Sequence, residues 1–282
     1  MTGGAISGTG TGTTISSALS GSTGLSFSGG GSRTISGDNT GLTGLIDVAA
    51  GVVRVGNNNA LGSSSANADR VQLQGGTVLQ LSGGIALPKA ITTTNANTIQ
   101  AIGNSSIAGA LSFGGTTFFQ LDTGAELTLG GSAGLGTTGS TLQTIGTGRL
   151  ILDAAGAGAT AYGFFIRGTD MTVQANAVAN PFGAAANINL GDSAGDHTLA
   201  LNGATIGNNA FLAAAASSRK IENMAAGTST YAGQVFLGDF TTVLRSTTTS
   251  GTLAVSGHLR DDGGTANLEI GNATHTNSQK SD

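Results

Sequence analysis

Short segments that mix apolar and small polar residues recur along almost the whole chain, separated by pairs such as Gly-Gly, Asn-Gly, Gly-Asn or Ser-Gly. Most of them alternate large apolar residues with polar or small ones, which is the period of a half-buried β-strand. The separating pairs supply the positive φ angles that tight turns require. The chain is therefore predicted to be all-β and built from many short strands. The clearest strand candidates are residues 44–48, 52–55, 70–73, 77–81, 126–129, 171–174, 187–190, 198–201 and 253–255.

The spacing of these strands favours one all-β architecture over the others. They often begin only about 7–10 residues apart, whereas a sandwich or meander usually has turn signals every ~8–12 residues and leaves polar faces outside. A solenoid explains the short spacing better, because each coil uses two or three short strands and then climbs one level. We therefore predict a right-handed parallel β-helix (β-solenoid) in a single elongated domain, with about 11–14 coils of roughly 20–25 residues. At about 4.8 Å per coil, the rod would be about 50–70 Å long.

Composition excludes several classes of protein. The chain combines 38% hydrophobic residues with a net charge of only −4, which is unlike a disordered chain. Its 11 Lys and Arg residues are mostly scattered singly, so no nucleic-acid partner is predicted. With no Cys there are no disulfides and no thiolate metal sites. No apolar run approaches the ~18 residues of a membrane span. The core is expected to consist of Val, Leu, Ile and Ala, with Phe at wider places.

Three regions follow from local composition. Residues 1–35 are rich in Gly, Ser and Thr, and are predicted to form an irregular N-terminal coil or arm. Residues 36–271 are predicted to form the solenoid, and residues 272–282 a polar tail. Short correspondences suggest two divergent repeats of about 120 residues within the solenoid, approximately 42–148 and 160–271. The matching segments are 59–62 with 180–183, 79–83 with 199–203, 107–113 with 231–237 and 126–131 with 252–257.

The first seven residues lack the basic residues and the apolar run of a signal peptide. We expect that a leader has been removed, that the chain is a segment of a longer protein, or that export uses another route.

Residues 36–62 carry a recognisable likeness. Ser36-Gly37-Asp38-Asn39-Thr40, followed by Gly51-Val52-Val53-Arg54-Val55-Gly56-Asn57-Asn58-Asn59-Ala60-Leu61-Gly62, resembles the autotransporter-associated β-strand repeat. Gly41 or Leu42 stands where that family usually has an aromatic residue. The resemblance implies a right-handed parallel β-helix of the passenger type, exported to the bacterial surface or secreted. It implies no catalytic residues.

Candidate chemical sites are few. Arg260-Asp261-Asp262-Gly263-Gly264 is the only compact acidic cluster, and it also has the composition of a solvated turn. Asp192 and Asp196 bracket a short segment and have the oxygens to hold Ca²⁺, although a turn explains them better. His197, His258 and His275 lie far apart in sequence. The chain is thus predicted not to be an enzyme, and to have no catalytic residues, no metal site and no cofactor.

Two pairs of adjacent aromatic residues are the candidates for an interaction surface. In a strand, one ring of Phe118-Phe119 and one of Phe164-Phe165 would point inward and the other outward. The inward rings are ordinary core, whereas outward rings could mark contacts with a partner, a second copy or a sugar face; a loop packing over them is the alternative. Asn residues recur near strand ends, where most are expected to support turns and some to form an amide ladder at one corner.

Three functions stay open at this level. The first is an extracellular or cell-surface structural protein, a stalk or fibre segment that assembles head-to-tail with copies of itself by strand pairing. The second is an adhesin or carbohydrate-binding passenger domain that binds surface glycans, which predicts exposed aromatic rings in a row on one lateral face. The third is a β-helical polysaccharide lyase or hydrolase, in which Asp153, Asp170 and Asp192 would line up with Arg149 or Arg167.

Overall fold

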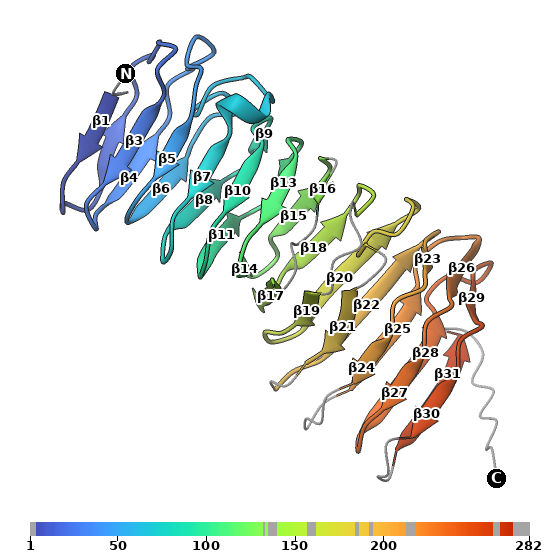
Figure 1. Ribbon diagram of the computed structural model, residues 1–282. Helices are drawn as coiled ribbons and strands as arrows, with labels where there is room; N and C mark the ends of the chain where they lie inside the picture. Colours follow the sequence, from blue (N-terminus) through green and yellow to red (C-terminus); the bar gives the residue numbers. More distant parts are fainter. Residues whose placement is uncertain are drawn as a thin grey trace.

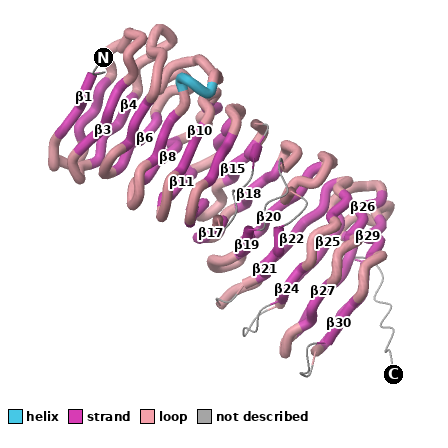
Figure 2. Tube along the Cα trace, in the orientation of Figure 1, coloured by secondary structure: helices cyan, strands magenta, loops and turns pink. Residues whose placement is uncertain are grey.

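The computed structural model shows an elongated rod of stacked coils, a parallel β-solenoid as predicted (Figure 1). It describes residues 4–131, 133–134, 140–156, 162–183, 186–191, 194–212, 218–261 and 266–272. Every strand pairing in this part of the chain is parallel and joins a strand to strands from the coils before and after it. Strands and turns make up almost all of the structure; one short 3₁₀ helix, η1 (Asn67–Asp69), interrupts them (Figure 2).

Four sheets run along the rod. The 7-stranded sheet contains β1 (Gly4–Ser7), β3 (Leu25–Ser28), β5 (Ile46–Val48), β7 (Val71–Leu73), β10 (Ile91–Thr93), β13 (Leu111–Phe113) and β16 (Ala133–Gly134). The 12-stranded sheet contains β2 (Thr13–Ile15), β4 (Ser32–Ile35), β6 (Val52–Val55), β8 (Val78–Ser82), β11 (Asn97–Ile102), β14 (Thr116–Leu121), β17 (Thr141–Gly146), β19 (Tyr162–Ile166), β21 (Ala186–Leu190), β24 (Ala210–Leu212), β27 (Val235–Leu237) and β30 (Leu259–Asp261).

The other two sheets belong to the middle and C-terminal parts of the rod. The 9-stranded sheet contains β9 (Ala86–Leu87), β12 (Ser105–Ile107), β15 (Glu126–Leu129), β18 (Arg149–Leu152), β20 (Met171–Asn176), β22 (His197–Asn202), β25 (Arg219–Asn223), β28 (Thr241–Ser246) and β31 (Asn267–Asn272). The 3-stranded sheet contains β23 (Thr205–Ile206), β26 (Thr228–Tyr231) and β29 (Thr252–Val255).

The N-terminal region differs from the prediction of an irregular coil or arm. Residues 4–35 contribute β1 to β4 in regular register, with Gly4 paired to Leu25 and Thr13 paired to Arg33. Ladder hydrogen bonds come from the backbone, so Gly, Ser and Thr can form strands as long as a few apolar side chains point inward. Phe27 and Ile35 are fully buried and fill that role.

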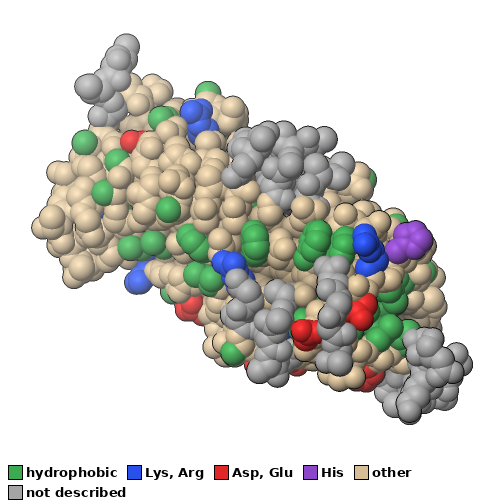
Figure 3. Space-filling model, turned by 60° about the horizontal axis from the view of Figure 1, so that its bottom comes forward, with side chains coloured by type: hydrophobic (Ala, Val, Ile, Leu, Met, Phe, Trp, Pro, Cys, Tyr) green, Lys and Arg blue, Asp and Glu red, His purple; other side chains and the backbone are tan. Residues whose placement is uncertain are grey.

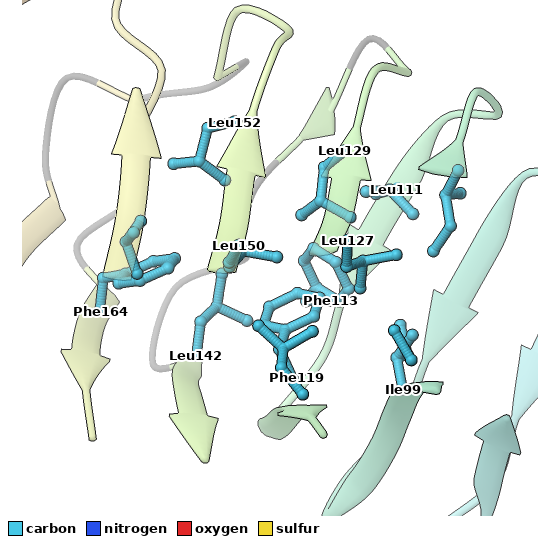
Figure 4. Packing of buried hydrophobic residues seen from close by; sticks show 14 of the residues in the cluster. Ile99, Leu111, Phe113, Phe119, Leu127, Leu129, Leu142, Leu150, Leu152 and Phe164 are labelled. Atoms are coloured by element: carbon cyan, nitrogen blue, oxygen red, sulfur yellow. The ribbon is translucent and has the colours of Figure 1, made fainter. Parts of the chain in front are cut away.

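The core is a set of apolar columns that run along the rod axis. Val53, Leu79, Ile99 and Phe119 occupy successive levels of one column, and all four are fully buried. Phe113 packs edge-on against Phe119, with ring centroids 5.6 Å apart, among leucines from neighbouring coils (Figure 4). Each such side chain contributes roughly 1.5–3 kcal/mol on burial. The core is thus thin but continuous, since every level is covered by the next.

Corners of the coils depend on glycine where two backbones come very close. A Cβ added to Gly233 would lie 1.9 Å from the Asn208 carbonyl oxygen, and one added to Gly257 would lie 1.8 Å from the Gly233 oxygen. These two glycines therefore stack on one corner of successive coils, at a distance that no side chain permits.

The motif in residues 36–62 builds two stacked corners. Asn39 is fully buried; its Nδ2 donates to the Ala60 oxygen at 2.5 Å and its Oδ1 accepts from the Leu19 N–H at 2.6 Å. One amide side chain thus joins three coils. Leu42, one of the two residues at the position where an aromatic was expected, is buried in the core cluster, to which Leu61 also belongs.

The proposed 120-residue correspondences connect segments of different sheets. Leu111–Phe113 forms β13 of the 7-stranded sheet, whereas its counterpart Val235–Leu237 forms β27 of the 12-stranded sheet. Likewise, Glu126–Leu129 lies in the 9-stranded sheet and its counterpart Thr252–Val255 in the 3-stranded one.

Candidate functional site

The two phenylalanine pairs divide between core and surface as strand geometry requires. Phe119 and Phe164 are fully buried, and Phe164 packs edge-on against Phe182 with centroids 5.0 Å apart. Phe118 and Phe165 point outward from β14 and β19 and are half-buried. The inward rings are thus core, and the outward rings both belong to the outer face of the 12-stranded sheet.

Strand register brings these outward rings into one row. Each member pairs with the next across adjacent strands, at intervals of 20–25 residues, which correspond to one coil. Figure 3 shows a broken line of hydrophobic side chains along the long axis of the face that it brings forward. The side chains that the strand register aligns are called the outer row: Thr98, Phe118, Gln143, Phe165, Asn189, Phe211 and Phe236.

Rings in the C-terminal part of the row are covered by their neighbours. Phe211 and Phe236 stack with centroids 4.4 Å apart and planes 5° from parallel, and the Arg260 guanidinium lies 5.4 Å from the Phe236 centroid. The Arg167 guanidinium lies 4.7 Å from the Phe165 centroid and donates to Gln143 Oε1 at 2.6 Å. Phe118, by contrast, has no ring-stacking or cation–π partner among the described residues.

An amide ladder runs beside the row. Arg54 Nε donates to Gln80 Oε1, Gln80 Nε2 donates to Gln100 Oε1 at 2.7 Å, and Gln100 Nε2 donates to Asp122 Oδ1 at 3.0 Å. Gln120 occupies the next position of the same column, and no hydrogen bond of its side chain is found among the described residues. One glutamine amide on this face therefore keeps its donors and acceptor for solvent or a ligand.

A groove of about 660 Å³ opens where β11, β14 and β17 end. Ile102, which is 36% exposed, and Ile145 supply its apolar surface. Gln120, Asp122, Thr123 and Thr147 supply polar groups, and the two threonine hydroxyls lie 2.9 Å apart.

The two long sheets differ sharply in charge. The eight strands of the 12-stranded sheet from β8 to β27 contain no Asp, Glu, Lys, Arg or His. Among the described residues, three ion pairs lie on or beside the 9-stranded sheet: Arg149–Glu126 at 3.2 Å, Lys220–Asp196 at 2.5 Å and Arg245–Glu222 at 2.9 Å. The middle strands under the aromatic row are thus uncharged themselves, and charged side chains such as Asp122 and Arg167 lie just beyond the strand ends.

The C-terminal coil is the second feature with functional potential. Among the described strands, β29, β30 and β31 each end a sheet and so present an unpaired strand edge. Leu259 and Ile270 continue the inward columns of Val235 and Leu244, yet they are 39% and 49% exposed because no coil formed by the described residues covers them. A hollow of about 450 Å³ opens over these side chains, lined also by Leu253 and Val255.

The acidic and basic candidates do not meet in one groove among the described residues. Arg149 pairs with Glu126, Asp153 accepts from Asn176 Nδ2 at 2.7 Å, and Asp170 Oδ1 accepts from the Asp196 N–H at 3.0 Å. Arg260 and Asp261 belong to β30 and are exposed. Residues Asp192 and 262–264 lie outside the described residues.

Asp196 is bound within the protein. Its carboxylate accepts from Lys220 Nζ and from the backbone and hydroxyl of Ser218, at 3.1 and 2.9 Å. The hydrogen bond from Lys220 is the main cause that lowers the pKa of Asp196 below its usual value. These contacts occupy the oxygens that were considered for Ca²⁺.

The three histidines have separate surroundings. His197 is fully buried with Nε2 2.8 Å from the Gly168 oxygen, and His258 is exposed. His275 lies outside the described residues. No group of three metal-ligating side chains is found within the described ranges.

Other perturbed groups are structural. Lys89 is fully buried, and its Nζ donates to the Asp69 carbonyl at 2.7 Å. Burial lowers the pKa of Lys89, while hydrogen bonds from Ser64 and the Gly44 N–H lower the pKa of Asp69. Burial also raises the pKa of Tyr231, whose hydroxyl donates to the Asn208 oxygen at 2.6 Å. Each of these groups fixes a corner between coils.

Asparagine acts both in corners and in a short ladder. Asn97 and Asn208 donate to carbonyls of the preceding coil, at 3.1 and 2.7 Å. On the 9-stranded sheet, Asn202 donates to Asn176 at 3.2 Å, and Asn176 to Asp153.

Sequence reasoning missed the glutamine ladder and the outer-row members Phe211 and Phe236. The signal that identifies them is recurrence at one-coil intervals, which can be read only when the register is known.

Comparisons with known proteins give no relative for this chain: no protein-family model, curated protein or solved structure matches it. In the described residues, no helix has the length and apolar character needed to cross a membrane.

Proposed function

We propose that this protein is an extracellular or cell-surface structural element, a solenoid segment that extends into fibres by head-to-tail strand pairing between copies. The open C-terminal coil is the observation that carries this proposal. Three unpaired strand edges and the exposed Leu259 and Ile270 side chains form a surface that an added coil would cover. Unpaired edges of this kind are templates for pairing with another chain.

The opposite end offers strands of the right direction. β1 and β2 end the 7-stranded and 12-stranded sheets, and their inward side chains Ile6 and Ile15 are only partly buried. Because all strands of the stack are parallel, the N-terminal edge of one copy meets the C-terminal edge of another without reversal. Such a heterologous contact does not close on itself and therefore generates a filament. β2 and β30 are the two end strands of the same 12-stranded sheet, so this pair of strands would join the two copies at each junction.

The proposed location outside the cell is supported by the sequence and not by the open C-terminal coil. Residues 36–62 resemble a repeat of exported passenger proteins, and the chain has no Cys and few charges. Antibody labelling of intact and permeabilised source cells tests this part of the proposal; labelling only after permeabilisation would contradict it.

The assembly is tested by negative-stain electron microscopy and sedimentation over a range of concentrations. We expect filaments of uniform width that lengthen with concentration. Ile270→Lys or Leu259→Lys places a charge in the junction and should give short single rods. Ile102→Lys is the matched control, because Ile102 is also an exposed apolar side chain but lies on the lateral face. Single rods at every concentration, or filaments unaffected by Ile270→Lys and Leu259→Lys, would overturn the proposal.

A further inference from the structure

We propose that the outer face of the 12-stranded sheet across β11, β14 and β17 binds a neutral, linear, β-1,4-linked polysaccharide that lies along the rod axis. This inference goes beyond the structural role and is independent of it. The binding surface consists of Phe118 from the outer row, Gln120 beside it, and the groove that contains Ile102, Asp122, Ile145 and Thr147.

The charge of the face selects a neutral ligand. Strands β8 to β27 of this sheet contain no Asp, Glu, Lys, Arg or His, and among the residues that line the groove only Asp122, just after β14, is charged. The ion pairs found among the described residues lie on or beside the 9-stranded sheet. Single-stranded nucleic acids also stack on rows of aromatic rings, but they need a positively charged groove that follows the phosphates. Here only Arg54 and Arg167 adjoin the surface, and both donate to glutamine oxygens. A sugar polymer without charges fits this chemistry, and a polyanion does not.

The polar groups on the surface match sugar hydroxyls. An amide donates and accepts, and a carboxylate accepts, so Gln120 and Asp122 can each bind one or more hydroxyl groups. No hydrogen bond of the Gln120 amide is found within the described residues. Asp122 Oδ1 accepts one hydrogen bond there, from Gln100 Nε2. The apolar C–H faces of a pyranose would pack on Phe118, Ile102 and Ile145. Phe118 serves this purpose better than Phe165, Phe211 or Phe236, whose rings are covered by arginine or by each other.

Periodicity fixes the direction of the ligand. Successive coils repeat the same outward positions about every 4.8 Å, which is close to the length of one hexose unit in an extended β-1,4-linked chain. Gln100 and Gln120 are adjacent in one column, and Phe118 and Gln143 are adjacent in the other. A linear polymer along the axis would therefore meet an equivalent position at each sugar.

The test is native affinity electrophoresis in gels that contain hydroxyethylcellulose, glucomannan or xylan, with polygalacturonate as the charged comparison. Calorimetry with cellohexaose and xylohexaose then gives affinities. We expect retardation by at least one neutral glycan and none by polygalacturonate. Combined Phe118→Ser and Gln120→Ala substitutions should weaken binding roughly tenfold or more. Thr172→Ala is the matched control. Thr172 is likewise a half-buried, outward-pointing residue, but it lies on β20 of the 9-stranded sheet, away from the proposed binding surface.

Folding and assembly are monitored separately. The variants should keep the far-UV circular dichroism and melting temperature of the parent protein. Ile102→Lys should lose glycan binding and keep filament formation, whereas Ile270→Lys should do the reverse. Failure of every neutral glycan to bind, stronger binding of polygalacturonate, or unchanged binding by the folded Phe118→Ser/Gln120→Ala variant would each overturn the proposal. A protein partner or a lateral dimer on this face would appear as one of these outcomes.

Discussion

At the scale of single residues, the solenoid depends on side chains that join one coil to the next. Asn39 accepts from the coil before it and donates to the coil after it, in a site without solvent. Gly233 permits the closest backbone approach at a corner. Both residue types were expected in turns from the sequence. Which of the many asparagines and glycines are indispensable depends on what the neighbouring coil places against them, and one sequence does not show that.

Replacing Asn39 by Ala should destabilise the N-terminal coils. The substitution leaves the Leu19 N–H and the Ala60 oxygen without their partner, and each buried unpaired group costs about 1–3 kcal/mol. Asn187→Ala provides the control, because Asn187 is exposed on β21. Urea unfolding followed by circular dichroism measures the difference. Equal midpoints for the two variants would show that the Asn39 bridge contributes nothing.

A methyl group at Gly233 should be far more damaging than one at Gly207. The added Cβ would lie 1.9 Å from the Asn208 oxygen at Gly233, whereas nothing lies within 4 Å of it at Gly207. Because backbone must move to relieve the first contact, Gly233→Ala should cost at least about 1–3 kcal/mol. Thermal melts of Gly233→Ala and Gly207→Ala decide this, and similar melting temperatures would refute the close approach.

At the scale of elements, hydrophobic alternation predicted many of the strands and the two faces of each, but not the order of the strands in the sheets. Residues 52–55 and 126–129 coincide with β6 and β15. Strands rich in Ser and Thr, such as β4 and β12, were not predicted, because their backbone pairs regardless of side chain and only one or two inward residues are apolar. The outer row escaped prediction for a related reason: alternation shows which residues of a strand share a face, but not which strands are neighbours.

The corner that connects β22 and β25 should respond to acid. Partners stabilise the ionised Asp196, so its folded pKa is below the unfolded value. The stabilisation is therefore present above the unfolded pKa of about 3.9 and is lost as the pH falls towards the folded pKa. Asp196→Asn should remove this part of the acid sensitivity, with an effect below about 1 kcal/mol because the pair is partly exposed. The difference between the unfolding midpoints at pH 7 and pH 3 measures this acid sensitivity, and Asp239→Asn, at an exposed position, is the control. If Asp196→Asn left that difference unchanged, the predicted role of Asp196 would be wrong.

At the scale of the whole molecule, the rod has two unlike ends and two unlike long faces. The elongated all-β architecture was predictable because composition and spacing excluded the alternatives. The exposed apolar C-terminal coil and the side-by-side arrangement of the uncharged strands were not, since both depend on which coil lies next to which. Stability of such a stack is close to a sum of nearest-neighbour terms between coils. Terminal coils have a neighbour on one side only, so they should open first.

Hydrogen exchange measured by mass spectrometry connects this gradient to the proposed assembly. In single rods of the Ile270→Lys variant, amides of β29 and β30 should exchange faster than those of β11 and β14, because local opening needs the loss of one coil interface instead of two. In filaments of the parent protein, a second copy would cover the C-terminal coil and supply partners to its edge. Protection of β29, β30, β1 and β2 should then rise together, while β11 and β14 stay unchanged. A rise at only one end would mean that the junction is not head-to-tail, and equal exchange along the single rod would show that the solenoid unfolds as one cooperative unit.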